Sequence, residues 1–407
     1  MTDQTLAARY APVFMLDRAE PYQPYAAGWT VFRTRGKSPS SKFEIEPVAD
    51  IVVEYAVFYD WDIGHLYDLE HVWVHIDADG GVARVEASSH GGRLVMDAGE
   101  GWAEFRNGRP VVYVEAGKHA HWASPHLMTA PAQRKLAALC GPLAGLEGVH
   151  LDNDLAKAGH FSASAADHRR ARLKMQRDSF VPSQQFVAAE TEPVLMPWPD
   201  LAAAIPGRVE AQLQALAEDR AHLAAIFIDC GDTLVDERTE VKEPGSEIVL
   251  RGDLIPGAKD MMLALKAAGY PLVLVADGPR QTFENLLQQH GLWDVFDAHI
   301  ISSDIGALKP DARMFDAALA ALGLARDDAW RCVMIGNNLS RDIKGANALG
   351  IVSVFMAWST LRTHVPADAS EVPDFRIAAP ARFPGLLDKI EALLPYRMPV
   401  QQSGETQ

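Results

Sequence analysis

Two carboxylates follow a short apolar run in the segment IFIDCGDTL, residues 226–234. Asp229 comes directly after the run, and Asp232 follows three residues later. An aspartate at the end of a buried strand can act as a nucleophile, and a nearby acid can transfer protons. Such a pair can also cap a turn, because aspartate side chains readily accept backbone N–H bonds. This segment alone leaves both interpretations open.

Three later segments place polar residues after apolar runs in the same way. They are VLVADG, ALKPD and VMIGNNLSRDIKG, and they supply Asp277, Lys309, Asn337 and Asp342. Helical patterns separate these runs, which is typical of strands that alternate with helices in a parallel sheet. Ligand-binding groups gather at the carboxyl ends of such strands, so we expect these side chains to converge on one site.

A second group of metal-binding residue types lies nearer the N-terminus. The segment GHLYDLEHVWVHID and two later segments supply candidate ligands, namely His65, Asp68, Glu70, His90, His119 and His121. Imidazole and carboxylate groups at strand ends can converge on one divalent cation. Side chains alternate along a strand, so Asp68 and Glu70 are expected to face the same side. The alternative is a set of loop histidines that bind no metal.

The two groups lie in regions of different sequence pattern. Residues 1–200 are rich in Val, Tyr, Phe and Trp with hairpin signals, which predicts a β-sandwich domain with a helical tail. Residues 201–223 have apolar residues at helical spacing and are expected to form a connector helix. The alternating pattern of residues 224–393 predicts a Rossmann-like α/β domain. Residues 394–407 are expected to be a mobile tail.

Length and composition limit the possible functions. The chain has 407 residues and a net charge of −16, so two domains with an acidic surface are expected. Such a surface repels phosphate backbones, and no nucleic-acid partner is expected, although a pocket with a cation can still hold a small phosphorylated or other small-molecule substrate. No membrane span or secretory signal is recognisable, and three distant cysteines argue against a disulfide framework. We expect a cytoplasmic protein.

The segments IFIDCGDTL, VLVADG, LKPDARMF and MIGNNLSRDIKGAN, in this order, resemble the four motifs of the haloacid dehalogenase superfamily. The resemblance covers roughly residues 224–393 and implies a hydrolase that forms a phosphoaspartyl intermediate with Mg²⁺ as cofactor. Little chain remains between the motifs, so a core without a large cap is expected. Such an open site accepts bulky substrates, or another domain or subunit of an oligomer serves as its lid.

The resemblance also implies a role for individual residues. It gives the catalytic residues as Asp229, Asp232 and Lys309, with Asp229 as the nucleophile. It gives the residues at the phosphate as Thr233, Ala276, Asp277 and Gly278. It gives the Mg²⁺ ligands as Asp229, the backbone carbonyl of Gly231, Asn337 and Asp342.

Three positions depart from the pattern of that superfamily. Gly231 stands where the acid/base aspartate is usual, and Asp232 comes one residue later, which turns its side chain to the opposite face of an extended segment. Ala276 lacks a hydroxyl group, and Asn337 offers an amide in place of a carboxylate. A degenerate scaffold in a binding or assembly protein is therefore the alternative to a phosphatase. Another superfamily reaction, such as dehalogenation, is a further alternative.

The segments GHLYDLEHV, SSHGG and GRPVVYVEAGKHAHWASP resemble the vacuolar-protein-sorting-sixty-two family and the related necrosis-inducing-like proteins. This resemblance covers about residues 8–127 and implies a β-sandwich with a pocket for a second divalent cation. The matching ligands are His65, Asp68 and Glu70, whereas Tyr67 and Leu69 differ from the family's frequent residues. A third hypothesis therefore places the chemistry at this N-terminal site.

Overall fold

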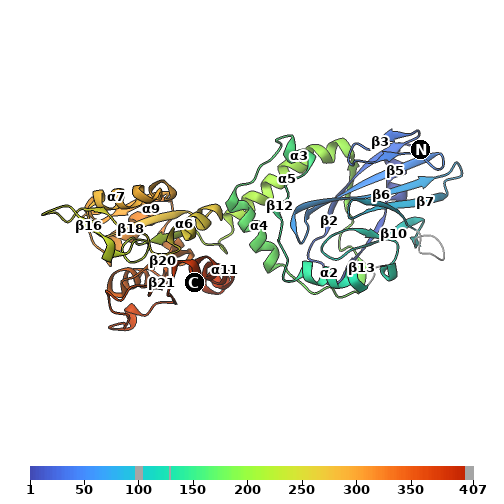
Figure 1. The fold of residues 1–407 in the computed structure, drawn as a ribbon. Coiled ribbons are helices and arrows are strands. Elements are labelled where there is room, and N and C mark those ends of the chain that lie inside the picture. Colours follow the sequence, from blue (N-terminus) through green and yellow to red (C-terminus); the bar gives the residue numbers. More distant parts are fainter. Residues whose placement is uncertain (97–103, 128–129, 399–407) are drawn as a thin grey trace, which may run out of the picture. The chain divides into compact units, whose positions relative to one another are not determined.

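The computed structural model of the protein describes residues 1–96, 104–127 and 130–398 (Figure 1). The chain divides into two compact units, which are unit 1, Met1–Glu218, and unit 2, Asp219–Gln407. Among the described residues, no helix is both long and apolar enough to cross a bilayer. Of the predicted tail, residues 399–407 lie outside the described part, whereas Leu394–Arg397 form a short 3₁₀ helix with Leu394 buried.

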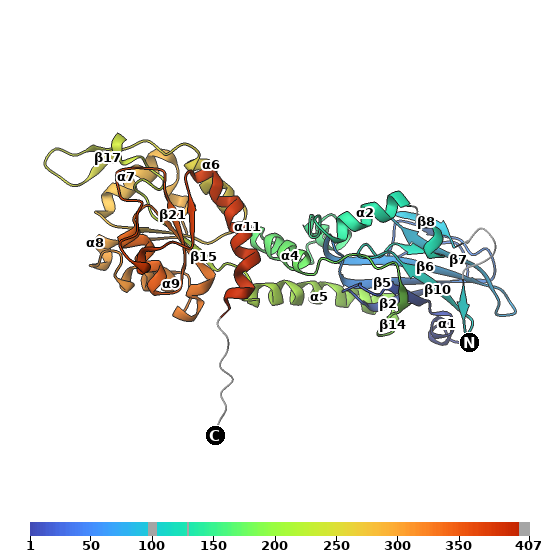
Figure 2. The same ribbon diagram turned by 90° about the horizontal axis from the view of Figure 1, so that it is seen from below.

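The larger sheet of unit 1 has the strand order β14-β2-β5-β6-β7-β8, with β12 paired to β6. Its strands are β2 Pro24–Phe32, β5 Ile51–Trp61, β6 His65–Ile76, β7 Val82–Ser89, β8 Gly92–Val95, β12 Gly148–Val149 and β14 Val194–Pro197. The long antiparallel pair β5 and β6 forms its centre (Figure 2). In this pair Tyr59 lies opposite Asp68, and Val57 lies opposite Glu70.

A smaller sheet of unit 1 has the order β11-β10-β1-β13, with β9 paired to β10. Its strands are β1 Val13–Asp17, β9 Phe105–Arg106, β10 Arg109–Val114, β11 His121–Trp122 and β13 Phe186–Ala188. Phe14 and Val112 from this sheet share one buried cluster with Tyr55, Val57 and Val74 from the larger sheet. The sheet-rich N-terminal half is thus confirmed, whereas its classification as a β-sandwich stays a prediction.

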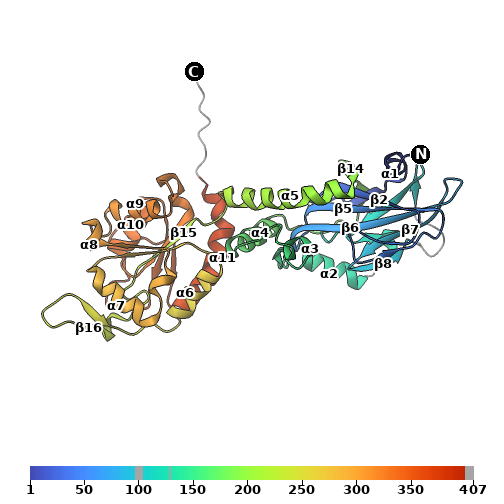
Figure 3. The same ribbon diagram turned by 90° about the horizontal axis from the view of Figure 1, so that it is seen from above.

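Helices and two very short strands complete unit 1. They are α1 Asp3–Tyr10, β3 Gly36–Lys37, β4 Glu44–Ile45, α2 Ala130–Cys140, α3 Asp154–Lys157, α4 Ala165–Arg177 and α5 Trp198–Glu218. Helix α5 occupies most of the predicted connector and lies along β2 (Figure 3). Its apolar stripe, with Leu201, Ile205 and Val209, packs into a buried cluster of unit 1. This burial stabilises α5 as part of unit 1.

Unit 2 contains a six-stranded parallel sheet with the order β19-β18-β15-β20-β21-β22. Its strands are β15 Ala225–Ile228, β18 Leu272–Ala276, β19 Ala298–Ile301, β20 Cys332–Gly336, β21 Val352–Met356 and β22 Phe375–Ile377. β15 is buried on both faces, because Ile226 and Ile228 join one apolar cluster while Ala225 and Phe227 join another. The predicted Rossmann-like parallel sheet is confirmed.

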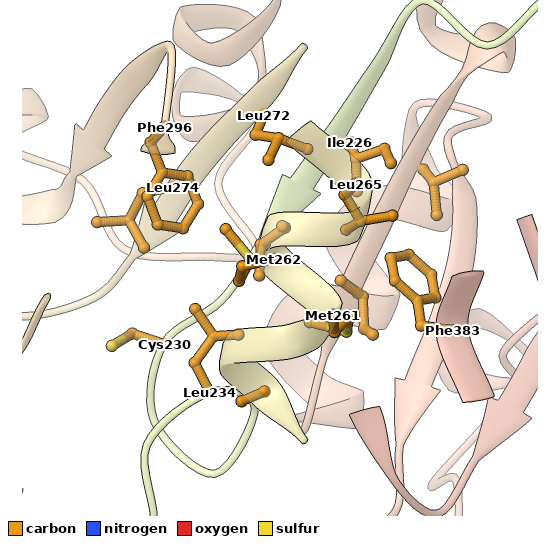
Figure 4. Close-up of a cluster of buried hydrophobic side chains, with 14 of the residues drawn as sticks. Ile226, Cys230, Leu234, Met261, Met262, Leu265, Leu272, Leu274, Phe296 and Phe383 are labelled. Carbon is orange, nitrogen blue, oxygen red and sulfur yellow. The ribbon is translucent and has the colours of Figure 1, made fainter. Parts of the chain in front are cut away.

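The helices of unit 2 pack against this sheet. They are α6 Ala258–Ala267, α7 Arg280–His290, α8 Ser302–Ile305, α9 Ala312–Ala321, α10 Lys344–Ala348 and α11 Phe383–Leu393. Figure 4 shows Met262 and Leu265 of α6 directed at the apolar side chains of the strands, including Leu272 and Leu274. Phe383, which begins α11, belongs to the same cluster. This packing fixes the central strands and hence the positions of the polar residues at their ends.

A short segment links β15 to α6 in unit 2. It contains a 3₁₀ turn at Glu237–Thr239 and the hairpin of β16 Val241–Lys242 with β17 Val249–Arg251. α7 holds the hairpin, because Thr282 Oγ1 accepts the N–H of Val249 at 2.9 Å and Asn285 donates to its carbonyl oxygen. All of this segment is described, and it contains no larger inserted domain.

Candidate active site

A cavity of about 390 Å³ lies at the carboxyl ends of the central strands of unit 2. Parallel strands deliver their following residues to the same edge, so residues distant in the sequence meet there. Seven of the residues predicted for this site line the cavity, namely Asp229, Gly231, Asp277, Gly278, Lys309, Asn337 and Asp342. The other three predicted residues, Asp232, Thr233 and Ala276, are fully buried and are not part of its lining.

A buried ammonium group lies at the centre of this site. Lys309 Nζ is 2.7 Å from Asp229 Oδ1 and 2.7 Å from Asp342 Oδ1, and it donates to the Val275 carbonyl at 2.7 Å. The ammonium donates hydrogen bonds to Asp229 Oδ1 and to the Val275 carbonyl, and it pairs with Asp342 by charge. Burial by itself lowers the pKa of Lys309, but the charges of Asp229 and Asp342 outweigh it and raise this pKa above its ordinary value. The site therefore holds a permanent positive charge.

Asp229 follows β15 and is fixed through both carboxylate oxygens. Oδ1 accepts from Lys309, and Oδ2 accepts from the hydroxyl of Thr233 at 3.2 Å. The backbone N–H of Asp229 donates to the carbonyl oxygen of Ile335 in β20 at 3.0 Å. The carboxylate lies at the cavity wall in a fixed orientation beside a cation. These are the properties that an attacking carboxylate needs.

Asp342 is the second carboxylate that contacts Lys309. Its Oδ2 accepts the backbone N–H of Asn338 at 2.9 Å, and its carboxyl group packs against Gly336. A Cβ at position 336 would lie 2.3 Å from Asp342 Oδ2, so glycine is required there. Burial and the charge of Asp229 raise the pKa of Asp342 to about 7. The positive charge of Lys309 lowers this pKa, but by less.

The segment after β18 contributes Asp277 and Gly278. Asp277 Oδ1 accepts the N–H of Lys309 at 3.0 Å, and its Oδ2 lies 3.3 Å from Arg341 Nη1. The N–H of Gly278 donates to the hydroxyl of Ser302 at 2.8 Å. Asp277 therefore holds the lysine backbone in place, and a hydroxyl group is present nearby on α8 although Ala276 lacks one.

Two further acids, Asp232 and Glu237, follow Asp229 in the chain, and the sequence alone does not show which of them reaches the cavity. Asp232 adopts a positive φ of 47°, and its Oδ1 accepts the backbone N–H of Glu237 at 3.1 Å. Glu237 lines the cavity, and both of its carboxylate oxygens contact Arg362. Burial raises the pKa of Glu237, and the charges of Asp232 and Asp229 raise it further. Arg362 lowers this pKa, but by less. The geometry favours a structural role for Asp232.

The cavity contains a set of oxygen donors suited to a hard cation. Asp229 and Asp342 offer carboxylates, Asn337 offers an amide oxygen, and Gly231 offers a backbone carbonyl. Mg²⁺ prefers oxygen ligands and usually takes only one or two carboxylates from the protein. The residues present therefore fit Mg²⁺, with Lys309 sharing the two carboxylates.

Unit 1 contains a second cluster of possible ligands. One donor atom from each of Asp62, Asp68 and His119 lies within 4.8 Å of the others. His119 Nδ1 is 3.5 Å from Asp68 Oδ2, and its Nε2 is 3.6 Å from Glu20 Oε1. Burial lowers the pKa of His119, but Asp68 and Glu20 outweigh it and raise this pKa to about 10. Burial raises the pKa of Asp68, but His119 outweighs it and lowers that pKa to about 2.

The other ligands predicted in unit 1 have different partners. Glu70 accepts from the hydroxyl of Ser88, and burial with the charge of Asp68 raises the pKa of Glu70 to about 8. His65 Nδ1 lies 2.8 Å from the carbonyl oxygen of Tyr67. The two remaining histidines point elsewhere: His90 contacts Glu115, and His121 contacts the carbonyl oxygen of His71. The structure adds Asp62 to the cluster. This residue was not among the ligands predicted from the sequence, and it lies just before the segment GHLYDLEHV.

The sequence is similar to a protein family and to several curated phosphatases. Residues 160–350 match the family model of haloacid dehalogenase-like hydrolases. A glyceraldehyde 3-phosphate phosphatase of Methanopyrus kandleri is 31% identical over 141 residues, which cover 35% of this chain and 56% of the relative. A phosphoserine phosphatase of Thermus thermophilus is 32% identical over 127 residues, which cover 31% and 48%. The chain spans about half the length of the curated relatives it matches.

A solved structure gives a similar match. The haloacid dehalogenase phosphatase of Thermococcus onnurineus is 27% identical, with a TM-score of 0.29, over 33% of this chain and 58% of that one. The family match includes β15, β18, β19 and β20 and all residues from Asp229 to Asp342. The chain therefore contains a haloacid dehalogenase-like hydrolase domain, as the motifs predicted. The resemblance of unit 1 to the two other families stays a prediction.

Proposed function

We propose that the haloacid dehalogenase-like hydrolase domain of this chain is an active phosphatase that uses Asp229 as its nucleophile. The observation that carries this proposal is the contact of 2.7 Å between Lys309 Nζ and Asp229 Oδ1 at the wall of a cavity. A buried ammonium beside the carboxylate stabilises the charge of an approaching phosphoryl group. A merely structural scaffold does not need a lysine directed at an accessible carboxylate.

The proposed reaction has two steps. One oxygen of Asp229 attacks phosphorus, the bond from phosphorus to the ester oxygen breaks, and the electron pair leaves with that oxygen as an alkoxide, which takes a proton from solvent water. Water then attacks the phosphorus of the aspartyl phosphate, and its bond to Asp229 breaks with return of the electron pair to the carboxylate. Lys309 remains charged throughout, and Thr233 keeps the carboxylate oriented through its hydroxyl group.

Asp229, Asn337, Asp342 and the carbonyl of Gly231 are the residues that would hold Mg²⁺. When bound, this ion would offset the repulsion between the carboxylate and the anionic substrate. The amide of Asn337 lowers the negative charge of the donor set by one unit relative to an acid. We therefore expect weaker attraction of the ion than three carboxylates would provide.

The substrate class that we propose is a small phosphorylated compound. Two of the relatives act, by their names, on glyceraldehyde 3-phosphate and on phosphoserine. The cavity volume of about 390 Å³ suits a molecule of that size. Arg341 and Arg362 also line this cavity and offer positive charge to an anionic substrate. The degenerate-scaffold alternative provides no reason for this combination.

The test is hydrolysis of a panel of phosphate esters with added Mg²⁺, comparing the wild-type protein with Asp229→Asn and Asp68→Asn. We expect phosphate release from the wild type and from Asp68→Asn, and none above background from Asp229→Asn. Turnover that survives Asp229→Asn but is lost in Asp68→Asn would move the chemistry to unit 1 and contradict the proposal.

A second function is favoured by the cluster in unit 1. We propose that Asp62, Asp68 and His119 bind a divalent cation, because their donor atoms lie within 4.8 Å of one another. The contacts of His119 at 3.5 and 3.6 Å are longer than ordinary hydrogen bonds. Asp68 and Glu20 favour the protonated ring, so a bound ion has to displace a proton from His119, and its binding should strengthen as the pH rises. A mixed set of nitrogen and oxygen donors suits Zn²⁺ or Mn²⁺ better than Mg²⁺.

Calorimetric titration of the full chain with Zn²⁺ and with Mn²⁺ tests this second proposal. The wild type is expected to show a binding event that Asp68→Asn removes and that Asp229→Asn retains. The same heat in the wild type and in Asp68→Asn would contradict it. This separates the site in unit 1 from the donors in unit 2.

A further inference from the structure

We propose that Glu237 is a further catalytic residue of unit 2, whose carboxylate takes the proton of the water that hydrolyses the aspartyl phosphate. This inference rests on the proposed phosphatase function and adds to it a base for its second step. It starts from the carboxylate that lies over Gly231, two residues after Asp229. Both Glu237 and Asp229 line the same cavity.

The space above Gly231 is filled by the side chain of Glu237. A Cβ built on Gly231 would lie 2.4 Å from Glu237 Oε1 and 3.2 Å from Glu237 Cγ and Cδ. The carboxylate therefore occupies the place in which a side chain of residue 231 would begin. A residue distant by six positions thus puts an acid group where the local sequence has none.

Two neighbours hold the carboxylate of Glu237 in this place. Asp232 Oδ1 accepts the backbone N–H of Glu237 at 3.1 Å and fixes the turn that carries it. Arg362 Nη2 donates to Glu237 Oε1 at 2.7 Å and to Oε2 at 2.9 Å. A guanidinium that contacts both oxygens fixes the orientation of the carboxylate. Asp232 and Arg362 are positioning residues in this assignment.

The other carboxylates of the cavity are less suited to this step. Asp229 and Asp342 both contact the ammonium of Lys309, and Asp277 is engaged with Lys309 N–H and with Arg341. Glu247 is largely exposed and is paired with a lysine on the hairpin. Glu240, half-buried on the same loop as Glu237, is the rival residue and provides a matched control.

The proton transfer balances without any further reactant. A lone pair of water forms the new bond to phosphorus, one water proton moves to a Glu237 oxygen, and the bond from phosphorus to Asp229 breaks. Its electron pair returns to the Asp229 carboxylate, and phosphate leaves. The side chain of Glu237 is 25% exposed, so the carboxyl group can release the proton to solvent afterwards.

The experiment is rapid mixing of Glu237→Gln with p-nitrophenyl phosphate and Mg²⁺. This substrate has a good leaving group, so Asp229 is phosphorylated without help from an acid. We expect a burst of nitrophenolate close to one equivalent of enzyme, followed by steady turnover lowered about 10²-fold. Mass spectrometry of the quenched sample is expected to find the phosphoryl group on Asp229. The absence of a burst together with unchanged steady turnover would overturn the assignment. An equal slowing of the burst and of the steady turnover would also overturn it.

Two control proteins make the result specific. Glu240→Gln is expected to show no accumulated phosphoenzyme, and accumulation there but not in Glu237→Gln would overturn the assignment. The double variant Gly231→Asp with Glu237→Ala returns a carboxylate to the same space. It is expected to recover steady turnover at least tenfold over Glu237→Ala alone, and a failure to exceed that single variant would count against the assignment.

The dependence of turnover on Asp229 separates a failure of the proposed phosphatase function from a failure of the role of Glu237. Turnover that depends on Asp229, combined with no phosphoenzyme in Glu237→Gln, overturns the role of Glu237 alone. Wild-type turnover that does not depend on Asp229 overturns the proposed function and the role of Glu237 with it.

Discussion

Unit 2 and unit 1 both gather buried carboxylates around positive side chains, but they pack them differently. In unit 2, Lys309 contacts Asp229 and Asp342 at 2.7 Å each, so the opposite charges touch. In unit 1, His119 stays 3.5 Å from Asp68 and 3.6 Å from Glu20. Close contact suits a site that fixes a nucleophile beside a permanent charge. Wider spacing around a ring suits a site that an ion can enter.

The two regions also obtain their residues in different ways. The residues of unit 2 follow the carboxyl ends of parallel strands, which meet at one edge of the sheet. In unit 1, Asp68 lies on β6, which belongs to an antiparallel pair. His119 lies in a loop and has a positive φ of 55°. Parallel topology therefore collects a site from ordinary strand ends, whereas the antiparallel sheet needs a special loop conformation.

The largest effect is expected from Asp229→Asn in unit 2. An amide cannot attack phosphorus, so turnover of a phosphate ester should fall at least about 10³-fold. Measurement of initial rates with Mg²⁺ checks this, with thermal unfolding to show that the variant folds. Asp68→Asn in unit 1 is the matched control and should keep its turnover. A comparable loss in both variants would mean that the two regions contribute to one reaction.

Removal of the buried ammonium gives the next largest effect. Lys309→Met leaves Asp229 and Asp342 buried beside each other without a cation, which should cost about 3–5 kcal/mol in the free energy of unfolding. Urea denaturation followed by circular dichroism measures this cost. Lys309→Arg should not restore turnover, because a planar guanidinium cannot replace a compact ammonium that contacts two buried carboxylates.

Lys118→Met in unit 1 is the control for that comparison. Lys118 Nζ contacts the buried Asp62 at 2.7 Å, but its side chain is partly exposed, and among the described residues no second carboxylate lies at that distance. Its loss should therefore cost less than the loss of Lys309. An equal cost in the two variants would contradict the distinction drawn between the regions.

Cation binding should stabilise unit 1 by a smaller amount. A ligand at a hundred times its Kd stabilises the folded state by about 2.7 kcal/mol. Thermal scans of the full chain with Mn²⁺ or Zn²⁺ should show this stabilisation, and a chelator should reverse it. Asp68→Asn should remove the shift, because Asp68 supplies one of the three donors. A shift that persists in Asp68→Asn would place the ion elsewhere.

The sequence allowed a correct prediction of the parallel sheet because its apolar runs and helices alternate regularly. The same regularity led to Asp229, Lys309, Asn337 and Asp342, which the structure brings to one cavity. Glu237 was not predictable in this way. Its carboxylate reaches the cavity through a turn that depends on the positive φ of Asp232, and local sequence patterns do not specify that conformation.

The N-terminal ligands show the same limit. Strand alternation relates Asp68 to Glu70, but it contains no information on which distant loop approaches them. His119 is close to Asp68, whereas His90 and His121 have other partners. All three histidines lie near strand ends, so their residue type did not distinguish them. The backbone path of each loop decides which ring joins the cluster.

The smallest effect is expected from Asp232→Asn. Together with Glu237→Gln, this variant compares the roles of the two acids near Asp229, which are Asp232 and Glu237. Asparagine tolerates the positive φ of this position and keeps an oxygen that accepts the Glu237 N–H. The stability cost should stay below about 1 kcal/mol, and turnover should fall far less than in Glu237→Gln. Thermal unfolding and initial rates on one preparation measure both quantities. If Asp232 were the proton-transfer group, Asp232→Asn would lose as much turnover as Glu237→Gln, because the amide removes the acid while leaving the turn intact.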